Sequence, residues 1–218
     1  MKTVVITGST RGIGFGLAKE FASRGCGVVI SGRSQAGVDV AVESLLAQFP
    51  SAQITGVPCD VTDTVQLENL WKVAANAFSS VDIWINNAGI GHPQQSAWDV
   101  SEATVRQVID VDLLGLVFGT QVALRGMLSQ GHGQIYNMEG FGSDGAVRAG
   151  MSVYGASKRA VRYFTRSIIK ETKGTAVKVG TLSPGIVITD FITDMYRDDP
   201  SGLEQSKKIF NILGDRVE

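Results

Sequence analysis

Thr7-Gly8-Ser9-Thr10-Arg11-Gly12-Ile13-Gly14 is a glycine-rich segment between a short apolar run and an amphipathic segment. The apolar run covers residues 3–7, and the amphipathic segment continues to Gly25, where a helix is expected to end. Glycine permits a tight turn and close backbone approach, and the first turn of a helix attracts phosphate groups. The order of strand, glycine-rich turn and helix therefore predicts an anion-binding turn at the first strand of a parallel sheet.

The rest of the chain repeats this alternation of a short apolar run and a long amphipathic segment. We expect further strands at residues 27–31, 53–57, 81–85, 134–137 and 177–182, and helices at residues 35–49, 62–78, 102–127 and 152–170. The predicted fold is α/β, a Rossmann-type doubly wound parallel sheet with helices on both faces, in a single domain, residues 1–218. Such a sheet usually continues with one more helix and an edge strand, so the chain is either a minimal version of the fold or lacks that last pair.

Composition and charge exclude several classes of function. The chain has 218 residues, 44% of them hydrophobic, and a net charge of -1, so it has no general basic field for nucleic acid. Two cysteines, Cys26 and Cys59, and two histidines make a zinc site unexpected. Both cysteines lie in or beside apolar runs and are predicted to be buried free thiols in a reducing compartment. Met1 leads almost directly into the first strand, which predicts a cytoplasmic protein without signal peptide, transit peptide or membrane span.

Tyr154 and Lys158, in the run Tyr154-Gly155-Ala156-Ser157-Lys158, carry the predicted chemistry. Residues four apart on a helix lie on one face. Tyrosine ordinarily has a pKa near ~10, and a nearby lysine ammonium favours the tyrosinate and lowers that pKa. Such a pair can give a proton to a substrate oxygen, or remove one, near neutral pH. The spacing also occurs by chance on helix surfaces, so it indicates catalysis only together with a nucleotide site.

The end of the second predicted strand indicates which nucleotide the chain binds. A dinucleotide without a 2′-phosphate is usually held there by a carboxylate, but this strand ends Ser31-Gly32-Arg33-Ser34. Arg33 is placed to meet a 2′-phosphate, and Arg11 in the glycine-rich turn can reach it from the other side. We therefore predict NADP(H) as the cofactor. Asp60, after the third strand, is placed to accept a hydrogen bond from the adenine amino group.

Four motifs follow one another along the chain: Thr7-Gly8-x-x-x-Gly12-x-Gly14, Asn86-Asn87-Ala88-Gly89, Tyr154-x-x-x-Lys158 and Pro184-Gly185-x-x-x-Thr189. With them the chain resembles the short-chain dehydrogenase/reductase family over essentially its whole length. The resemblance implies that Tyr154 is the acid/base and that Lys158 binds the nicotinamide ribose and lowers the tyrosine pKa. The residues expected to contact the cofactor, from these motifs and the strand ends, are Gly8, Ser9, Thr10, Arg11, Gly12, Ile13, Gly14, Arg33, Ser34, Asp60, Val61, Asn86, Asn87, Ala88, Gly89, Tyr154, Lys158, Pro184, Gly185, Val187 and Thr189.

Two positions depart from the family pattern. The family's catalytic serine usually follows the asparagine that ends the fifth strand by two or three residues, and here Glu139 and Gly140 take those places after Asn137. Ser143 is the nearest hydroxyl and the candidate replacement, since the glycines around it allow an unusual backbone path. Asp112 stands where the family usually has an asparagine that helps to hold a proton-relay water. An aspartate can supply the same backbone carbonyl, so Asp112 is also a candidate catalytic residue.

The loop that follows Asn137 resembles the corresponding loop of the chlorophyll b reductases, a branch of the family in which a Gly-Ser pair replaces the usual double serine. Its sequence is Met138-Glu139-Gly140-Phe141-Gly142-Ser143-Asp144-Gly145. The start of the Tyr154 helix, the run from Ser183 to Thr189 and the run Phe210-Asn211-Ile212-Leu213 are also similar to that branch.

The expected reaction is the reduction of an aldehyde or ketone by NADPH, with Tyr154 protonating the developing alkoxide and Ser143 donating a hydrogen bond to it. Apolar residues between positions 191 and 210, a region that closes over substrate in the family, favour a bulky hydrophobic substrate. A 3-oxoacyl or sugar-alcohol reductase would keep this chemistry. A non-catalytic NADP-binding sensor or scaffold would lose it, and Glu139 and Asp112 support that alternative.

Apolar residues lie on more than one face of the helix at 102–127. Together with the assembly common in the family, they predict a homodimer or homotetramer.

Overall fold

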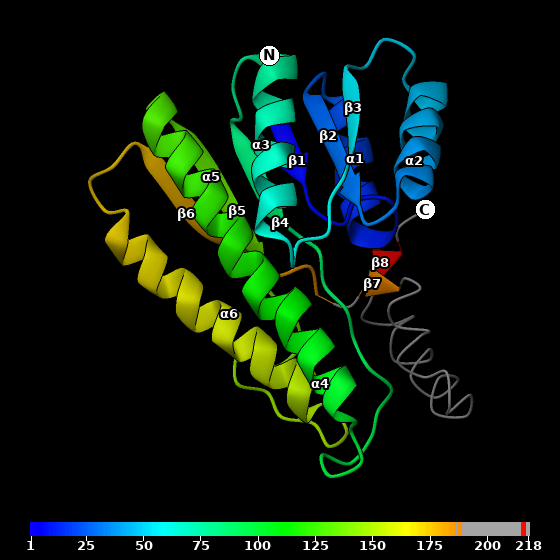
Figure 1. Ribbon diagram of the computed structural model, residues 1–218, viewed down its shortest axis with the longest axis vertical. Helices are drawn as coiled ribbons and strands as arrows, with labels where there is room; N and C mark the ends of the chain where they lie inside the picture. The colour runs from blue at the N-terminus through cyan, green and yellow to red at the C-terminus, as the bar shows by residue number, and fades with distance from the viewer. Residues whose placement is uncertain (186, 189–214, 217–218) are drawn as a thin grey trace.

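The computed structural model describes residues 1–185, 187–188 and 215–216, with side chains for residues 1–185. The main sheet has six parallel strands in the order β3-β2-β1-β4-β5-β6 (Figure 1). The strands are β1 (Thr3–Ile6), β2 (Gly27–Gly32), β3 (Ile54–Pro58), β4 (Ile83–Asn86), β5 (Gly133–Met138) and β6 (Val177–Leu182). The predicted doubly wound parallel sheet is confirmed.

Helices cover both faces of this sheet. They are α1 (Gly12–Ser23), α2 (Gln35–Gln48), α3 (Thr64–Phe78), α4 (Glu102–Ile109), α5 (Leu116–Gln130) and α6 (Ser152–Glu171). Figure 1 shows α3, α5 and α6 on one face, with α1 and α2 on the other. Successive side chains of a strand point to opposite faces, so Val5 joins the core under α3 and α5 while Val4 and Ile6 join the core under α1 and α2. Because both faces are covered, the central strands β1 and β4 are buried at every residue.

The carboxyl ends of the strands meet at one edge of the sheet. Ile6 pairs with Ile30 of β2 and with Ile85 of β4, so the segments that follow these three strands emerge side by side. The chain order reverses between β1 and β4, and in an open α/β sheet ligands bind in the crevice outside such a switch point. The fold therefore brings the glycine-rich turn and the Asn86-Asn87-Ala88-Gly89 motif to the place where a nucleotide is expected.

The sequence predicts a helix at residues 102–127, and the structure has a continuous helix over residues 102–130, which is not α-helical throughout. Between α4 and α5, Asp110–Gly115 is a π-helical segment. Gly115 lies against the segment that follows β3, since a Cβ on it would come within 2.6 Å of Val61 Cγ2. Short π segments inside α-helices are frequent at functional sites. The sequence predicts the helix but not this π-helical segment, which carries Asp112.

By length and apolar composition, the continuous helix Glu102–Gln130 is the one helix in the described part of the chain that could cross a membrane. Of its most apolar segment, 44% is buried within the protein, where α5 packs on β4, β5 and α3. Of the apolar residues from which the sequence predicted a subunit contact, Leu114 is 38% exposed, and the others are buried or half-buried: Val108, Val111, Leu113, Leu116, Val117 and Phe118.

Both cysteines are free thiols. Cys59 is buried as predicted, and burial, with smaller contributions from Asp60 and Asp63, raises its pKa to about 12. Cys26 is only half-buried, so the prediction that both thiols are buried is wrong in its case.

After β6 the structure describes a short parallel pair, β7 (Val187–Ile188) and β8 (Asp215–Arg216). Thr189 and the apolar residues between 191 and 210 lie outside the described residues. The predictions that concern them, including a contact between Thr189 and the cofactor, stay predictions.

Candidate active site

The glycine-rich turn after β1 is closed by the motif that follows β4. Gly8 and Gly12 have φ angles of 62° and 58°, which favour glycine. A Cβ on Gly8 would lie 2.8 Å from Ala88 Cα, and one on Gly14 would lie 2.5 Å from Asn87 Nδ2. The two glycines therefore let the turn and the start of α1 lie close against Ala88 and the side chain of Asn87.

Hydrogen bonds from Thr7 and Asn87 fix this contact. The Asn87 side chain donates to the carbonyl oxygens of Thr7 and Gly8 at 2.9 and 3.0 Å. In return, the Thr7 hydroxyl accepts from the backbone N–H groups of Asn87 and Ala88, both at 3.0 Å. The floor of the crevice is thus built from side chains of two separate motifs.

Ser9 ties the other side of the turn to the end of β2. Its buried hydroxyl donates to Ile6 O at 2.7 Å and accepts from Ser31 N at 2.9 Å. Gly32 makes room for Thr10, whose Cγ2 would lie 2.6 Å from a Cβ there. Ser9 was predicted to contact the cofactor, but its hydroxyl makes these hydrogen bonds within the protein, so its side chain shapes the turn.

The two arginines predicted to bind the 2′-phosphate lie on neighbouring segments of the chain. Because the turn is joined to β2, Arg11 at the start of α1 and Arg33 at the end of β2 emerge from adjacent segments, and both are exposed. Ser34 caps α2 by accepting from Gly37 N at 3.2 Å. After β3, Val61 is buried, and Asp60 is half-buried and accepts from the Thr62 hydroxyl at 2.8 Å.

Tyr154 and Lys158 lie on one face of α6, as predicted, and point into the protein. Tyr154 is 7% exposed and Lys158 is 4% exposed, with the lysine Nζ 5.5 Å from the tyrosine ring centroid. Asp112 enters from the π-helical segment, and its Oδ2 lies 3.2 Å from Lys158 Nζ. Its Oδ1 accepts from Ile90 N at 2.7 Å. The aspartate therefore meets the lysine with its side chain, a role that the sequence did not predict.

Gly89 joins this cluster to the floor of the crevice. A Cβ on Gly89 would lie 3.3 Å from Lys158 Nζ and 3.4 Å from Asp112 Oδ1. The lysine, the aspartate and the nucleotide motif after β4 therefore form one continuous site.

The pKa values of the three buried groups are coupled. Burial raises the pKa of Tyr154, the ammonium of Lys158 lowers it and the carboxylate of Asp112 raises it, with a net direction upward. Burial lowers the pKa of Lys158, but Asp112 and Tyr154 raise it, and the net direction is again upward. Burial raises the pKa of Asp112 more than Lys158 and the Ile90 N–H lower it. The prediction that the lysine leaves the tyrosine with a lowered pKa is wrong for this structure, in which burial outweighs the lysine.

The loop after β5 packs on the tyrosine. A Cβ on Gly140 would overlap the Tyr154 hydroxyl, so this position has to be glycine for the tyrosine to sit where it does. Ser143 is buried, and its hydroxyl donates to Glu139 at 3.3 Å. The sequence predicted Ser143 near the tyrosine oxygen; the structure places it in the loop that touches that oxygen, with Glu139 as a partner that was not predicted.

The remaining predicted cofactor residues follow β6. Pro184 is half-buried, and Gly185 is exposed with a φ of 70°. Val187 lies in β7.

Comparison with known proteins identifies the family. The family model for short chain dehydrogenases matches residues 2–200. The chain belongs to the short chain dehydrogenase family.

Two relatives of this dehydrogenase in Arabidopsis thaliana are plant reductases. A chloroplastic chlorophyll(ide) b reductase is 36% identical over 99% of this chain and 62% of its own length. A probable chloroplastic chlorophyll(ide) b reductase is 34% identical over 97% of this chain and 45% of its own length. The resemblance to that branch is confirmed, and the chain spans less than two thirds of the length of these relatives.

Solved structures of short chain dehydrogenases hold either nicotinamide cofactor. A member from Burkholderia phymatum in complex with NAD is 30% identical, with a TM-score of 0.82 over 93% of this chain and 71% of that chain. A serine dehydrogenase complexed with NADP+ is 28% identical, with a TM-score of 0.85 over 94% of this chain and 81% of that chain. They support a nicotinamide cofactor for this dehydrogenase.

A buried polar network that the sequence analysis missed stands behind the site of the dehydrogenase. Asn86 Oδ1 accepts from the Trp84 indole at 2.8 Å, and its Nδ2 donates to Thr120 and Asn137 at 3.0 and 2.8 Å. Asn137 in turn donates to Thr165 of α6 at 3.0 Å. The network joins the ends of β4 and β5 to α5 and α6, and so fixes the helix that carries Tyr154 and Lys158.

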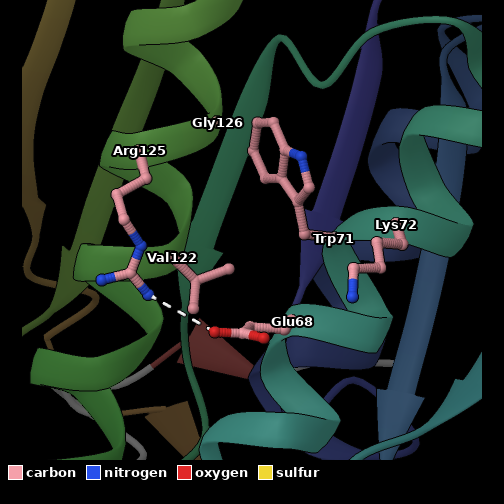
Figure 2. Close-up of a pocket in the computed structure, with 6 residues that line it drawn as sticks. All are labelled: Glu68, Trp71, Lys72, Val122, Arg125 and Gly126. Carbon is pink, nitrogen blue, oxygen red and sulfur yellow. Dashed lines mark ion pairs between the residues drawn. The ribbon is translucent and has the colours of Figure 1, made fainter.

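A separate pocket lies between α3 and α5 and contains none of the predicted site residues (Figure 2). Arg125 and Glu68 face each other across it, with 3.8 Å between their charged atoms. Gly126 allows the Trp71 indole to lie against α5, since a Cβ there would overlap the ring. This pocket is a product of helix packing. Among the residues that the structure describes, no cluster of histidine, cysteine, aspartate and glutamate could hold a metal ion.

Proposed function

We propose that this dehydrogenase is an NADPH-dependent carbonyl reductase in which Tyr154 is the general acid. The observation that carries the proposal is the position of Gly89, where an added Cβ would touch both Lys158 and Asp112, so that the nucleotide crevice and the buried tyrosine–lysine pair adjoin in one site. The glycine-rich turn supports a dinucleotide, because it joins the carboxyl end of β1 to the start of α1 beside the point where the chain order of the sheet reverses.

The residues of the chain divide the work of the reduction. When bound, NADPH supplies the hydride that the carbonyl carbon receives. As the C=O electron pair moves onto oxygen, Tyr154 gives its proton to that oxygen. Lys158 stabilises the tyrosinate that is left, and Asp112 holds the lysine in place. The raised pKa values of Tyr154 and Lys158 suit this direction, because both groups carry their protons at neutral pH.

Arg33 and Arg11 support NADPH over NADH. Both are exposed on adjacent segments at the end of β2, where no carboxylate follows the strand to accept from a ribose hydroxyl. Two guanidinium groups suit a phosphate, through charge-assisted hydrogen bonds.

The substrate is proposed to be a bulky hydrophobic aldehyde or ketone, of the chlorophyll type. Two relatives at 34% and 36% identity are described as chlorophyll(ide) b reductases. Apolar residues among positions 191–210, such as Phe191, Ile192 and Phe210, are in keeping with such a substrate.

A non-catalytic NADP-binding protein is the second candidate. The Ser143 hydroxyl is occupied by Glu139 in place of a substrate, which favours it. The buried Tyr154 and Lys158 favour catalysis, because a protein that only bound nucleotide would gain nothing from keeping a tyrosine and a lysine together in the interior.

A panel of carbonyl compounds tests the proposal. NADPH oxidation is followed at the nicotinamide absorbance with a formyl-bearing chlorin, an aromatic aldehyde, a 3-oxoacyl thioester and a ketose, and repeated with NADH. We expect turnover with NADPH and the bulky aldehydes. Tight NADPH binding with no oxidation by any carbonyl would favour the non-catalytic alternative. Turnover of the thioester or ketose alone would instead indicate a 3-oxoacyl or sugar-alcohol reductase.

A further inference from the structure

Glu139 is a buried carboxylate at the place where the family usually has its serine. It directly follows β5, and its backbone N–H donates to Leu182 O at 2.8 Å, which extends the pairing of β5 and β6 by one residue. Its side chain is only 4% exposed. A buried carboxylate is costly unless it is paired, so its partners indicate why it is kept.

Each oxygen of Glu139 has its own partner. Oε2 accepts from the Ser143 hydroxyl at 3.3 Å, and Oε1 lies 3.6 Å from Nε of Arg162 on α6. The arginine offsets the cost of the buried charge from one side. The other side of the carboxylate is then turned to the serine.

Ser143 is held at its backbone as well as at its hydroxyl. Its N–H donates to Gly140 O at 3.1 Å, and Arg159 donates to its carbonyl oxygen at 3.0 Å. Gly140 is the residue that packs on the Tyr154 hydroxyl. The turn from Gly140 to Ser143 is therefore held in place beside Tyr154, the general acid of the proposed reaction.

The hydroxyl of Ser143 can donate one hydrogen bond, and in this structure it donates it to Glu139. A substrate carbonyl oxygen is a weaker acceptor than a carboxylate, whereas the alkoxide that develops during reduction is a stronger one. The Ser143 hydroxyl therefore keeps its hydrogen bond to Glu139 while substrate is bound and donates to the substrate oxygen as negative charge develops there. A donor used only in the transition state raises kcat without raising substrate affinity.

We propose that Glu139 is a positioning residue that aims the hydroxyl of Ser143, with Arg162 holding the carboxylate. In this chain a glutamate and a displaced serine together do what a single serine does elsewhere in the family. The inference rests on the proposed carbonyl reductase activity.

Steady-state kinetics of paired variants test the inference, with NADPH and a carbonyl that the unmodified protein reduces. Glu139→Ala is expected to lower kcat about 10-fold while KM and NADPH affinity stay within about two-fold. The Ser143 hydroxyl loses its orientation in this variant, and its hydrogen bond to the substrate oxygen is made in the transition state. Glu139→Gln keeps an oxygen acceptor for Ser143 and is expected to recover most of kcat. Arg162→Met is expected to act in the direction of Glu139→Ala, with Arg166→Met, an exposed arginine one turn further along α6, as the control.

The decisive step repeats these changes in the Ser143→Ala background. If Glu139 acts through Ser143, Glu139→Ala and Arg162→Met lose their effect on kcat there. Equal losses in both backgrounds, or a Glu139→Gln protein as slow as Glu139→Ala, would overturn the inference while leaving the reductase activity intact. An unmodified protein that reduces no carbonyl would instead overturn the proposed function, and the inference with it. Thermal unfolding of each variant shows that the compared proteins are folded.

Discussion

The carboxylate of Asp112 lies 3.2 Å from the ammonium of Lys158, and both groups are almost fully buried. The aspartate comes from the π-helical segment and the lysine from α6, so the pair joins the two helices that flank the proposed site. Breaking a buried pair by removing one charge is strongly destabilising, which makes this contact a structural constraint as well as a chemical one.

Asp112→Asn is expected to move the alkaline limit of carbonyl reduction to lower pH. Without the carboxylate, the pKa of Lys158 falls, because burial then acts with less opposition. The pKa of Tyr154 also falls, because Asp112 raises it. Reduction needs both protons, so both changes act in the same direction. The pH dependence of kcat/KM measures this shift.

Asp110→Asn is the matched control, since Asp110 is an exposed acid in the same π-helical segment. Its alkaline limit is expected to coincide with that of the unmodified protein. An Asp112→Asn profile that stays in place or moves upward would contradict the role given to the ion pair.

Gly140→Ala is expected to lower kcat by roughly 10²-fold, because the added methyl group displaces the Tyr154 hydroxyl and small misplacements of a catalytic group are costly. The overlap also costs stability, about 1–3 kcal/mol by urea unfolding. Gly155→Ala on α6 is the control, since a Cβ there meets nothing within 4 Å. Unchanged turnover in Gly140→Ala would mean that the tyrosine does not need its place against this loop.

Arg33→Asp is expected to shift cofactor preference from NADPH towards NADH. It removes one charged partner of the 2′-phosphate, worth about 1.5–3 kcal/mol, and adds an acceptor for the ribose hydroxyls. Dissociation constants from nicotinamide fluorescence measure the shift, with Arg166→Asp as the control. Equal affinity of the unmodified protein for both cofactors would refute the assignment.

The protein is expected to be at least a dimer that uses the long helix from Glu102 and α6. The exposed apolar residues on these helices are Leu114, Leu128, Tyr163 and Ile169. Light scattering at micromolar protein gives the mass, and Tyr163→Lys should lower it, since Tyr163 is 77% exposed on α6. Trp98→Lys, at a residue before α4 that is 85% exposed, is the control. A monomeric mass for the unmodified protein would contradict the prediction.

Most of the fold and the outline of the site could be predicted because they depend on local patterns. The alternation of apolar runs and amphipathic segments located the strands of the main sheet and the helices between them, and β6 was predicted residue for residue. The spacing of Tyr154 and Lys158 put them on one helix face, where the structure has them. The burial of Tyr154 and Lys158, and the meeting of the strand ends at one edge of the sheet, then follow from the fold.

The parts that could not be predicted depend on contacts between distant residues. Asp112 was expected to act through its backbone carbonyl, but the π-helical segment directs its carboxylate to Lys158. No local pattern joins Asn86 to Asn137, which lie 51 residues apart and meet only because β4 and β5 are neighbours. The direction of the Tyr154 pKa depends on burial, which spacing along a helix does not reveal.

Single-turnover hydride transfer in Tyr154→Phe tests the central claim most directly. The variant, loaded with NADPH in excess over a carbonyl that the unmodified protein reduces, is followed by loss of the nicotinamide absorbance, with Tyr163→Phe as the control. Removing a positioned general acid should slow the transfer by about 10²–10⁴-fold while the NADPH dissociation constant stays within about two-fold. Transfer in Tyr154→Phe at the rate of the unmodified protein would contradict the account.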